Sequence, residues 1–527
     1  MFTFLPAATR LLRRAALFLG ALALWPSHLF AEAVRPNVLL IIADDWGGGH
    51  AGAYGCAWIQ TPNFDRVARE GLLFGNAYTP TAKCAPSRSA ILTGRYPWLL
   101  GAAANHQCFF PPELGIFPEV LEQHGYVYAS TGKVWGPGIA LKADGSPRPM
   151  AGRQFQQKKT QPPTPEISSN DYGANFQAFL EQAAPGQPWF FWMGAIEPHR
   201  DYAQGSGARL GGKKTSQIDR VPAYLPDNET VRGDLLDYAY EVEYFDQQVG
   251  RALELLRRTG QLDHTLVIVT SDNGMPFPRV KGNAYEAANH LPLAMRWPAG
   301  IRNPGRVVAD YVSFVDLAPT ILHAAGIEWP RHGLAPASGV SLLDLFADKP
   351  ATLRDHVLVG RERNDVGRPG DVGYPIRGMV GEGWLYVENC EPSRWPACNP
   401  ETGYLDTDGS PTKSFILNAR REKGADPFWE WCFGMRPGRE LYQLREDPDC
   451  VRNLAGERAA DVERLRNRMW AELKASGDLR ALGRGLEYEA YPPADRKRQH
   501  FYERFLGGEV LDAPWVRKAD FEKAPLK

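Results

Sequence analysis

Four short apolar segments along the chain share one pattern, in which a β-prone run stops at polar residues. These segments are residues 38–43, 126–130, 189–193 and 266–270. Unbroken apolar runs of this length are typical of strands that are covered on both faces. Between them lie amphipathic patterns that predict helices at residues 61–70, 117–124 and 234–258. Alternating strands and helices predict an α/β fold with a large, mostly parallel sheet.

Polar side chains follow these predicted strands at the point where each strand ends. They are Asp44 and Asp45, then Lys133, then His199, and finally Asp272 with Asn273. Because ligands of open α/β sheets bind beyond the carboxyl ends of the strands, we expect these side chains to converge on one site. Singly, an Asp pair or an Asp-Asn-Gly sequence is typical of a turn or a helix cap. Together, three carboxylates and an amide oxygen form an oxygen-only ligand set that suits Ca²⁺ or Mg²⁺ rather than zinc.

A cysteine lies at the start of another predicted helix, in residues 83–95, Lys-Cys-Ala-Pro-Ser-Arg-Ser-Ala-Ile-Leu-Thr-Gly-Arg. Pro86 suits the first helical turn, and Gly94 can end the helix. The free N–H groups and the dipole of a helix N-terminus favour an anion beside Cys84. Arg88 follows four residues later and therefore lies on the same helical face. A free, buried cysteine beside a capping serine is the structural alternative.

Composition and the N-terminus restrict the possible classes of function. A chain of 527 residues with 44% hydrophobic residues is expected to form one large domain and a smaller one. The net charge is −1, and no basic cluster is present, so nucleic acid is not an expected partner. Three arginines precede the apolar residues 15–25, and small residues follow near Ala31 and Ala33, which predicts a signal peptide at residues 1–33 and export of the protein. A short membrane anchor is the alternative. No later apolar run is long enough to span a membrane.

The cysteine content matters in an exported chain, because disulfides form in oxidising compartments. The chain has seven cysteines, so at least one stays unpaired. Cys390 and Cys398 are close in sequence, as are Cys432 and Cys450, but the sequence does not fix any pairing.

The run Cys84-x-Pro-Ser-Arg-x-x-x-Leu-Thr-Gly-Arg95 resembles the signature of the type I sulfatases, in which this cysteine is oxidised to formylglycine. Residues 36–45 and the sequence Ser-Asp-Asn-Gly at 271–274 extend the resemblance, in order, over residues 35–350. It implies an alkaline-phosphatase-like α/β sandwich. The catalytic domain would span residues 34–370, a small C-terminal α+β subdomain 371–480, and a wrapping tail 481–527. The resemblance also implies a formylglycine-generating or radical maturation enzyme as a partner.

The resemblance further implies a role for each matching residue. The ligands of a Ca²⁺ or Mg²⁺ ion would be Asp44, Asp45, Asp272, Asn273 and the formylglycine at position 84. One hydroxyl of the hydrated aldehyde would attack the sulfur, and the second would then expel sulfate and regenerate the aldehyde. Arg88 would hold the diol, while Lys133 and Lys281 would bind the free sulfate oxygens. His199 would protonate the leaving group.

One position departs from the family pattern. The family commonly has a histidine two residues after the first lysine, but this chain has Trp135 there. An indole cannot relay a proton. His106 is a candidate substitute from a nearby loop, a shift in the register of the lysine is another explanation, and His290 is a further candidate.

Residues 197–200, 271–278 and 311–320 are most similar to the heparan N-sulfatase branch of the family, which acts on N-sulfoglucosamine. Similar motifs also occur in O-sulfatases, and the pocket decides between these substrates. Glu197 and Arg200 would contact the substrate, or they would form an ion pair with each other. The alternatives are an O-sulfatase acting on an algal-type polysaccharide, a phosphate or phosphonate ester hydrolase of the same fold, and a catalytically silent binding protein. The expected location is periplasmic or extracellular, or lysosomal in a eukaryote.

Overall fold

The computed structural model describes residues 35–330, 332–349 and 354–526. The signal peptide expected at residues 1–33 lies outside these ranges. No helix within them combines the length and the apolar character needed to cross a membrane.

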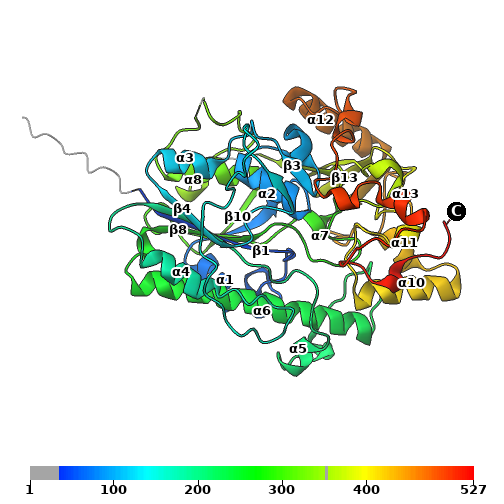
Figure 1. Ribbon diagram of the computed structural model, residues 1–527, viewed down its shortest axis with the longest axis horizontal. Helices are drawn as coiled ribbons and strands as arrows, with labels where there is room; N and C mark the ends of the chain where they lie inside the picture. Colours follow the sequence, from blue (N-terminus) through cyan, green and yellow to red (C-terminus); the bar gives the residue numbers. More distant parts are fainter. Residues whose placement is uncertain (1–34, 331, 350–353, 527) are drawn as a thin grey trace, which may run out of the picture. The chain divides into compact units, whose positions relative to one another are not determined.

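An eight-stranded sheet carries the site, and its strand order is β10-β2-β9-β8-β1-β7-β4-β6 (Figure 1). Only β9 runs antiparallel to its neighbours. The strands are β1 (Asn37–Ala43), β2 (Leu72–Tyr78), β4 (Val127–Gly132), β6 (Arg153–Gln154), β7 (Trp189–Gly194), β8 (Thr265–Ser271), β9 (Leu293–Arg296) and β10 (Arg306–Ser313). The four apolar runs of the sequence are β1, β4, β7 and β8, which lie next to one another in the sheet. The predicted mostly parallel α/β sheet is therefore confirmed.

Helices cover both faces of this sheet, which explains why its strands are continuously apolar. The helices on the face of Leu39 and Ile41 are α1 (Pro62–Arg69), α4 (Tyr172–Leu180) and α6 (Glu229–Arg258). Those on the face of Leu40 and Ile42 are α2 (Cys84–Thr93), α3 (Phe117–Gln123) and α8 (Leu317–Ala324). Helix α6 begins before the expected residue 234, because the Asn228 side chain accepts a hydrogen bond from Val231 N and caps the helix there.

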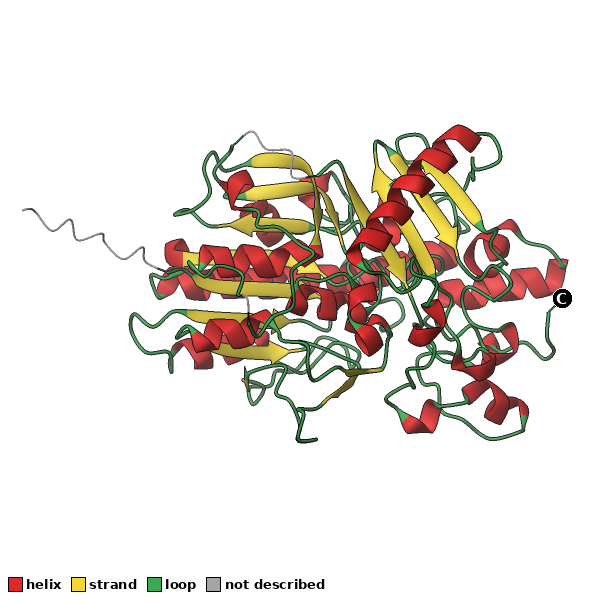
Figure 2. Cartoon of the chain, turned by 90° about the horizontal axis from the view of Figure 1, so that it is seen from above, coloured by secondary structure: helices red, strands yellow, loops and turns green. Residues whose placement is uncertain are grey.

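A second, antiparallel sheet has the order β11-β12-β13-β14 (Figure 2). Its strands are β11 (His356–Arg361), β12 (Ile376–Gly381), β13 (Trp384–Asn389) and β14 (Arg439–Gln443). Helix α12 (Ala459–Ser476) packs on one face through Leu465 and Met469. The small C-terminal α+β subdomain that the resemblance implied is thus present, and its sheet also includes β11, which precedes residue 371. The remaining elements are β3 (Cys108–Phe110), β5 (Gly138–Ala140), α5 (Ser206–Arg209), α7 (Glu286–Asn289), α9 (Leu343–Phe346), α10 (Pro411–Lys423), α11 (Pro427–Phe433) and α13 (Phe501–Leu506).

All seven cysteines lie within the described residues and carry free thiols. The pairs that are close in sequence are therefore not bonded in this structure. Cys398 is buried and its thiol donates to the carbonyl of Val366, and the thiol of Cys432 donates to the carbonyl of Tyr224.

Candidate active site

The side chains that follow four neighbouring parallel strands meet at one edge of the sheet. Ala43 pairs with Ser271, so Asp44 and Asp272 are the next residues of adjacent strands. Gly132 pairs with Gly194 in the same way, directly before Lys133. A Cβ atom on Gly194 would lie 1.7 Å from the Lys133 carbonyl oxygen, so only glycine lets the two strand ends approach this closely. The convergence expected from the sequence is present.

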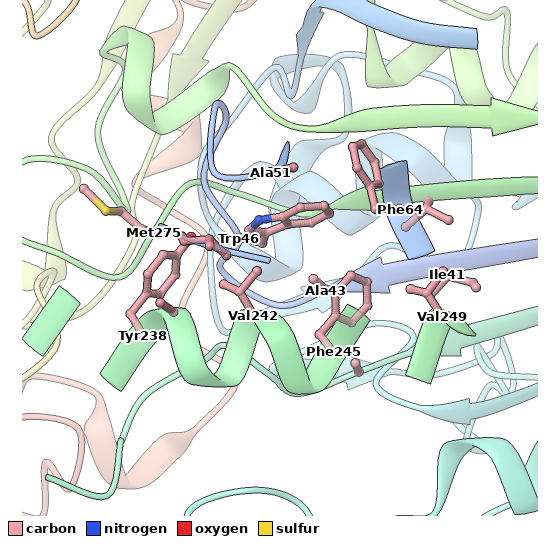
Figure 3. Packing of buried hydrophobic residues seen from close by; sticks show 14 of the residues in the cluster. Ile41, Ala43, Trp46, Ala51, Phe64, Tyr238, Val242, Phe245, Val249 and Met275 are labelled. Carbon is pink, nitrogen blue, oxygen red and sulfur yellow. The ribbon is translucent and has the colours of Figure 1, made fainter. Parts of the chain in front are cut away.

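The turn that carries the acidic pair is fixed by the residue after it, Trp46. Asp45 has a positive φ of 75°, a left-handed backbone conformation two residues after the end of β1. Trp46 N donates to the Ser271 hydroxyl at 2.8 Å. The indole packs edge-on against Phe64 of α1, with the ring centroids 5.0 Å apart, and lies 5.5 Å from the ring of Phe245 of α6 (Figure 3). Core packing thereby positions Asp44 and Asp45 beside β8.

The acidic residues form a tight, buried cluster. Ligand atoms of Asp44, Asp45 and Cys84 all lie within 4.8 Å of one another. Asn273 Nδ2 donates to Asp45 Oδ1 at 2.7 Å, while the buried Asn273 Oδ1 has no hydrogen-bond partner. A buried amide oxygen without a donor is costly, and a cation among these oxygens would satisfy it. The residues therefore fit a hard divalent cation.

Cys84 is the first residue of α2, as expected, and Gly94 ends this helix in the left-handed conformation. The Cys84 thiol is buried and donates to Asp44 Oδ1 at 3.3 Å. Arg88, which is fully buried, donates from Nε to Asp272 Oδ2 at 2.8 Å and from Nη1 to the Lys133 carbonyl at 2.7 Å. Arg88 Nη2 lies 3.9 Å from Asp44 Oδ1 and has no hydrogen-bond partner. Arg88 thus braces the acidic cluster and the end of β4 together.

Burial and nearby charges set the protonation states in this cluster. Burial raises the pKa of Asp272 to about 6, and the carboxylate of Asp44 adds to the rise. Burial also acts on Asp44, but Lys133 and Arg88 overcome it and hold the pKa of Asp44 well below its ordinary value. Burial, reinforced by Asp44, raises the pKa of the Cys84 thiol far above its ordinary value. The thiol is therefore protonated at neutral pH and is a poor nucleophile as it stands.

Two lysines and a histidine complete a small cavity above Cys84. The cavity has a volume of about 150 Å³, and its lining includes Lys133, His199 and Lys281. Lys133 Nζ contacts Asp44 Oδ2. Lys281 Nζ donates to Asp45 Oδ2 at 2.7 Å, and His199 Nε2 lies 3.9 Å from the same oxygen. The structure thus brings together all of the principal residues that the sequence indicated.

Sequence reasoning missed several residues of the cavity wall, which come from loops of the C-terminal half and from the tail. They are Asp365, Asp408, Arg498 and Trp515; Lys83, Gln107 and Pro137 of the N-terminal half also line the cavity. Asp408 accepts from Lys281 Nζ at 3.0 Å. Asp365 is paired with Lys83 at 2.8 Å and with His106 Nδ1 at 3.3 Å. These residues lie in segments without helical or strand periodicity, so no local sequence signal indicated them.

The weaker candidates have different surroundings. His106 lines the cavity. His290 is not among the residues lining it: its ring stacks on Tyr78, and its Nδ1 pairs with Glu286 at 2.9 Å. The indole N–H of Trp135 donates to the Ser89 hydroxyl at 2.8 Å.

Glu197 and Arg200 do not pair with each other. Glu197 is buried and accepts from Ser168 N at 2.8 Å and from the Tyr172 hydroxyl at 2.9 Å. Arg200 instead forms a bidentate pair with Asp234, at 2.7 and 2.9 Å. Arg200 lines a second cavity, which is described below.

A cavity that combines two lysines with an acidic cluster able to hold a divalent cation suits an enzyme that cleaves the ester or amide of a tetrahedral oxyanion. The sequence assigns the family within this class. Residues 36–327 match the family model described as Sulfatase, so the chain belongs to the sulfatase family, whose members are sulfate ester or N-sulfate hydrolases.

Individual relatives agree with this assignment. The human N-sulphoglucosamine sulphohydrolase is 30% identical over 462 residues, which cover 80% of this chain and 86% of the relative. An ulvan-active sulfatase from Formosa agariphila is 26% identical over 483 residues, covering 84% and 76%. A structure solved with its substrate, D-glucosamine-2-N,6-O-disulfate, has a TM-score of 0.57 at 18% identity and covers 88% of this chain and 100% of that one, which shows the shared fold.

Proposed function

We propose that this sulfatase removes a sulfate group from a sulfated saccharide, using a formylglycine made from Cys84 and a bound Ca²⁺ or Mg²⁺ ion. The observation that carries the proposal is the position of Cys84. It lies at the N-terminus of α2, in one cavity with Lys133, His199 and Lys281 and directly beside the acidic cluster. The protonated thiol would not serve as the nucleophile, which agrees with its conversion.

Five residues would hold the two groups that the family implies. The cation would bind Asp44, Asp45, Asp272 and Asn273, and it would contact the converted residue 84. A hydrated formylglycine would supply one hydroxyl as the nucleophile and a second hydroxyl whose loss of a proton expels sulfate and regenerates the aldehyde, and the cation would supply positive charge against the sulfate oxygens. Arg88 Nη2, which has no partner in the buried cluster, is available to hold the converted side chain.

The remaining residues bind the substrate and move protons. Lys133 and Lys281 now contact Asp44 and Asp45. A cation held by Asp44 and Asp45 would free Lys133 from Asp44 and leave Lys281 paired with Asp408 alone, so that both ammonium groups could contact the free sulfate oxygens. His199 Nδ1 donates a hydrogen bond to the Arg200 carbonyl at 2.6 Å, and His199 Nε2 lies toward the acidic cluster. We assign to Nε2 the proton that the leaving group takes.

His106 would supply the base that the family takes from the histidine missing at position 135. Trp135 holds its only polar hydrogen in a bond to Ser89. His106 lines the cavity and is held by the carboxylate of Asp365 at Nδ1. Burial lowers the pKa of His106, so the ring is neutral at neutral pH and can accept a proton.

The similarity to a human N-sulphoglucosamine sulphohydrolase and to an algal-polysaccharide sulfatase supports a saccharide substrate with an N- or O-linked sulfate. We also propose that the protein is exported, because residues 1–33 have the pattern of a signal peptide. A formylglycine-generating or radical enzyme would be its maturation partner.

The test combines mass spectrometry with a sulfate-release assay. The Cys84 peptide of protein produced with a maturation enzyme is expected to be about 18 Da lighter than the unmodified peptide. Sulfate release from N-, 2-O-, 4-O- and 6-O-sulfated saccharides is expected for the wild type and is lost in Cys84→Ala. Cys56→Ala, a change at a half-buried cysteine outside the cavity lining, is the control and stays active. Activity in Cys84→Ala, or release of phosphate alone from ester substrates, would contradict the proposal.

A further inference from the structure

The C-terminal tail contributes two residues to the wall of the active-site cavity. Arg498 and Trp515 line the same space as Cys84, although they lie near the opposite end of the sequence. A second cavity, of about 350 Å³, is lined by Arg200, Asp201 and Trp515 among others. Because Trp515 borders both cavities, it stands between the position of the sulfate and a larger space beside it. The rest of a saccharide would pass along this residue.

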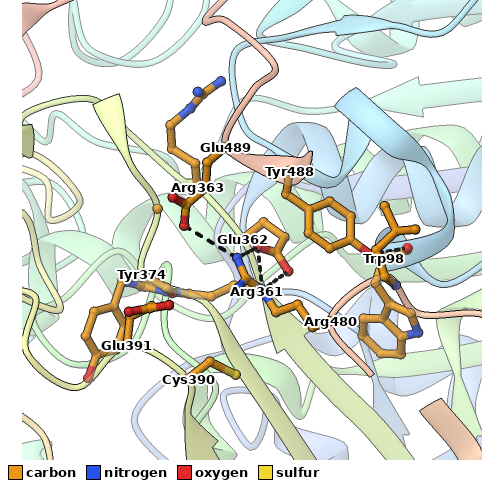
Figure 4. A network of polar contacts seen from close by, with 12 residues as sticks. Trp98, Arg361, Glu362, Arg363, Tyr374, Cys390, Glu391, Arg480, Tyr488 and Glu489 are labelled. Carbon is orange, nitrogen blue, oxygen red and sulfur yellow. Dashed lines mark hydrogen bonds and ion pairs between the residues drawn. The ribbon is translucent and has the colours of Figure 1, made fainter. Parts of the chain in front are cut away.

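The tail is held in this position from both sides. Before it, Arg480 pairs with Glu362 at 2.6 Å, and the Tyr488 hydroxyl donates to the Trp98 carbonyl at 2.6 Å (Figure 4). These contacts attach the segment after α12 to Trp98 and Glu362, two residues that lie before β12 in the sequence.

Further along, Trp515 itself docks on the loop that carries Asp408. The indole N–H donates to the Leu405 carbonyl at 2.8 Å, and the Trp515 carbonyl accepts from Gly409 N at 2.7 Å. A Cβ on Gly409 would lie 3.0 Å from Arg517 N, a tight contact, so a glycine favours this close approach. The loop and the tail therefore form one wall, which includes the carboxylate that accepts from Lys281.

Arg498 is a positively charged residue of this wall, and the carboxylate with which it pairs is exposed. Its guanidinium lies 4.4 Å from the centre of the Trp515 ring, and its Nε pairs with Asp495 at 3.2 Å. The side chain of Asp495 is 40% exposed, and it forms the one ion pair of Arg498 among the described residues. The two Nη groups are left for a ligand. By contrast, Lys83 is paired with Asp365, whose side chain is only 3% exposed.

The second cavity is less suited to a further anion. Its lining includes four acidic residues, Glu166, Asp201, Asp234 and Asp237, and two arginines, Arg517 and Arg200, of which Arg200 is already paired with Asp234. Carboxylates of this kind suit the hydroxyl groups of a sugar and repel a second sulfate or carboxylate. An additional negative group on the substrate would therefore bind on the other side of Trp515, beside Arg498.

We propose that Arg498 binds a second anionic group of the substrate and that Trp515 positions Arg498 for this contact. The substrate would then be a saccharide that carries a second sulfate or a carboxylate close to the sulfate that is removed. This inference rests on the proposed function, because it assumes that the sulfate binds above residue 84.

The test compares substrates that differ in charge. Wild type, Arg498→Gln and Arg498→Lys are assayed on three saccharides that share the hydrolysed linkage: monosulfated glucosamine, 2-N,6-O-disulfated glucosamine, and a monosulfated disaccharide with a uronate. Arg496→Gln is the matched control, because Arg496 is an exposed tail arginine outside both cavity linings. We expect Arg498→Gln to lower kcat/KM about tenfold on whichever dianionic substrate is bound, the size expected for one charge-assisted hydrogen bond, and to change it less than about twofold on the monosulfated sugar. Arg498→Lys restores part of the loss.

A purely structural role of Arg498 would lower all three values equally, and that result, or no loss, overturns the inference. If the wild type releases sulfate from none of the saccharides, the proposed function fails and this inference with it. If the wild type is active and Arg498→Gln does not change its preference for dianionic over monosulfated substrates, this inference alone fails.

Binding gives a second readout that does not depend on turnover. In the Cys84→Ala background, calorimetric titration with the disulfated sugar is expected to show a Kd about tenfold higher with Arg498→Gln. Trp515→Phe keeps the aromatic face and is expected to bind almost as tightly as the parent, whereas Trp515→Ala binds more weakly because Arg498 loses its support. Thermal unfolding of each variant checks that the fold is kept. Equal Kd values for the parent and Arg498→Gln contradict the assignment.

Discussion

Replacing Arg88 with alanine tests how the acidic cluster is held together. In the folded protein the Arg88 guanidinium is fully buried and contacts the Asp272 carboxylate at 2.8 Å and the Lys133 carbonyl at 2.7 Å. Arg88→Ala leaves both groups buried without this partner. Removing one member of a buried ion pair costs about 3–5 kcal/mol, because the other charge stays desolvated. We therefore expect the free energy of unfolding at neutral pH to fall by roughly 4 kcal/mol.

The assay is urea unfolding in the presence of a chelator, so that only the protein groups contribute. Arg88→Ala, Asp272→Asn and the double variant form a thermodynamic cycle. The losses in the free energy of unfolding of the two single variants are expected to add up to about 1–3 kcal/mol more than the loss in the double variant. The control is Arg66→Ala, which breaks the ion pair between Arg66 and Glu70. Both side chains are about a third exposed, so this change is expected to cost less than about 1 kcal/mol. A loss below about 1 kcal/mol in Arg88→Ala, or strictly additive effects in the cycle, would refute the reasoning.

Three further predictions concern other parts of the molecule. Asp272→Ala is expected to lose the divalent cation together with sulfate release, and full metal content by elemental analysis would contradict its assignment as a ligand. Burial raises the pKa of Asp246, which accepts from Phe64 N at 2.8 Å, to about 6. The folded state therefore binds more protons than the unfolded state between about pH 4 and 6, and the free energy of unfolding of the wild type should rise, relative to Asp246→Asn, as pH falls from 7 to 4; a constant difference in urea unfolding over this range would contradict the prediction. Arg377→Ala, which leaves the buried Asp478 without its partner at 2.7 Å, is expected to cost about 3–5 kcal/mol in the same assay, and an unchanged unfolding midpoint would argue against this.

The part of the site that the sequence predicts is the part built from strand ends. Asp44, Lys133 and Asp272 directly follow buried strands, and parallel pairing then brings them together whatever the loops do. The helix that begins at Cys84 is equally local, since its proline, its serine and its final glycine lie within one segment. The strands and the start of this helix are each determined by residues within one short segment, so a local sequence pattern can predict them.

The other part depends on contacts between distant segments, for which the sequence has no local signal. Asp365 and Asp408 lie in irregular loops of the C-terminal half, and they reach the cavity because the small sheet packs against the residues around Tyr78 and Tyr285. The tail was expected to wrap around the protein, but its composition did not indicate that Arg498 and Trp515 line the cavity. His290, a weaker candidate from the sequence, does not line the cavity and is paired with Glu286 instead.

The position of Trp515 in the cavity wall has a consequence for biosynthesis. A ribosome makes the chain from its amino end, so the strand ends and the helix of Cys84 emerge and can pack early. The wall that contains Trp515 is still missing at that stage, since the residues that build it are translated later. The central sheet can therefore fold before a ligand can be fully enclosed.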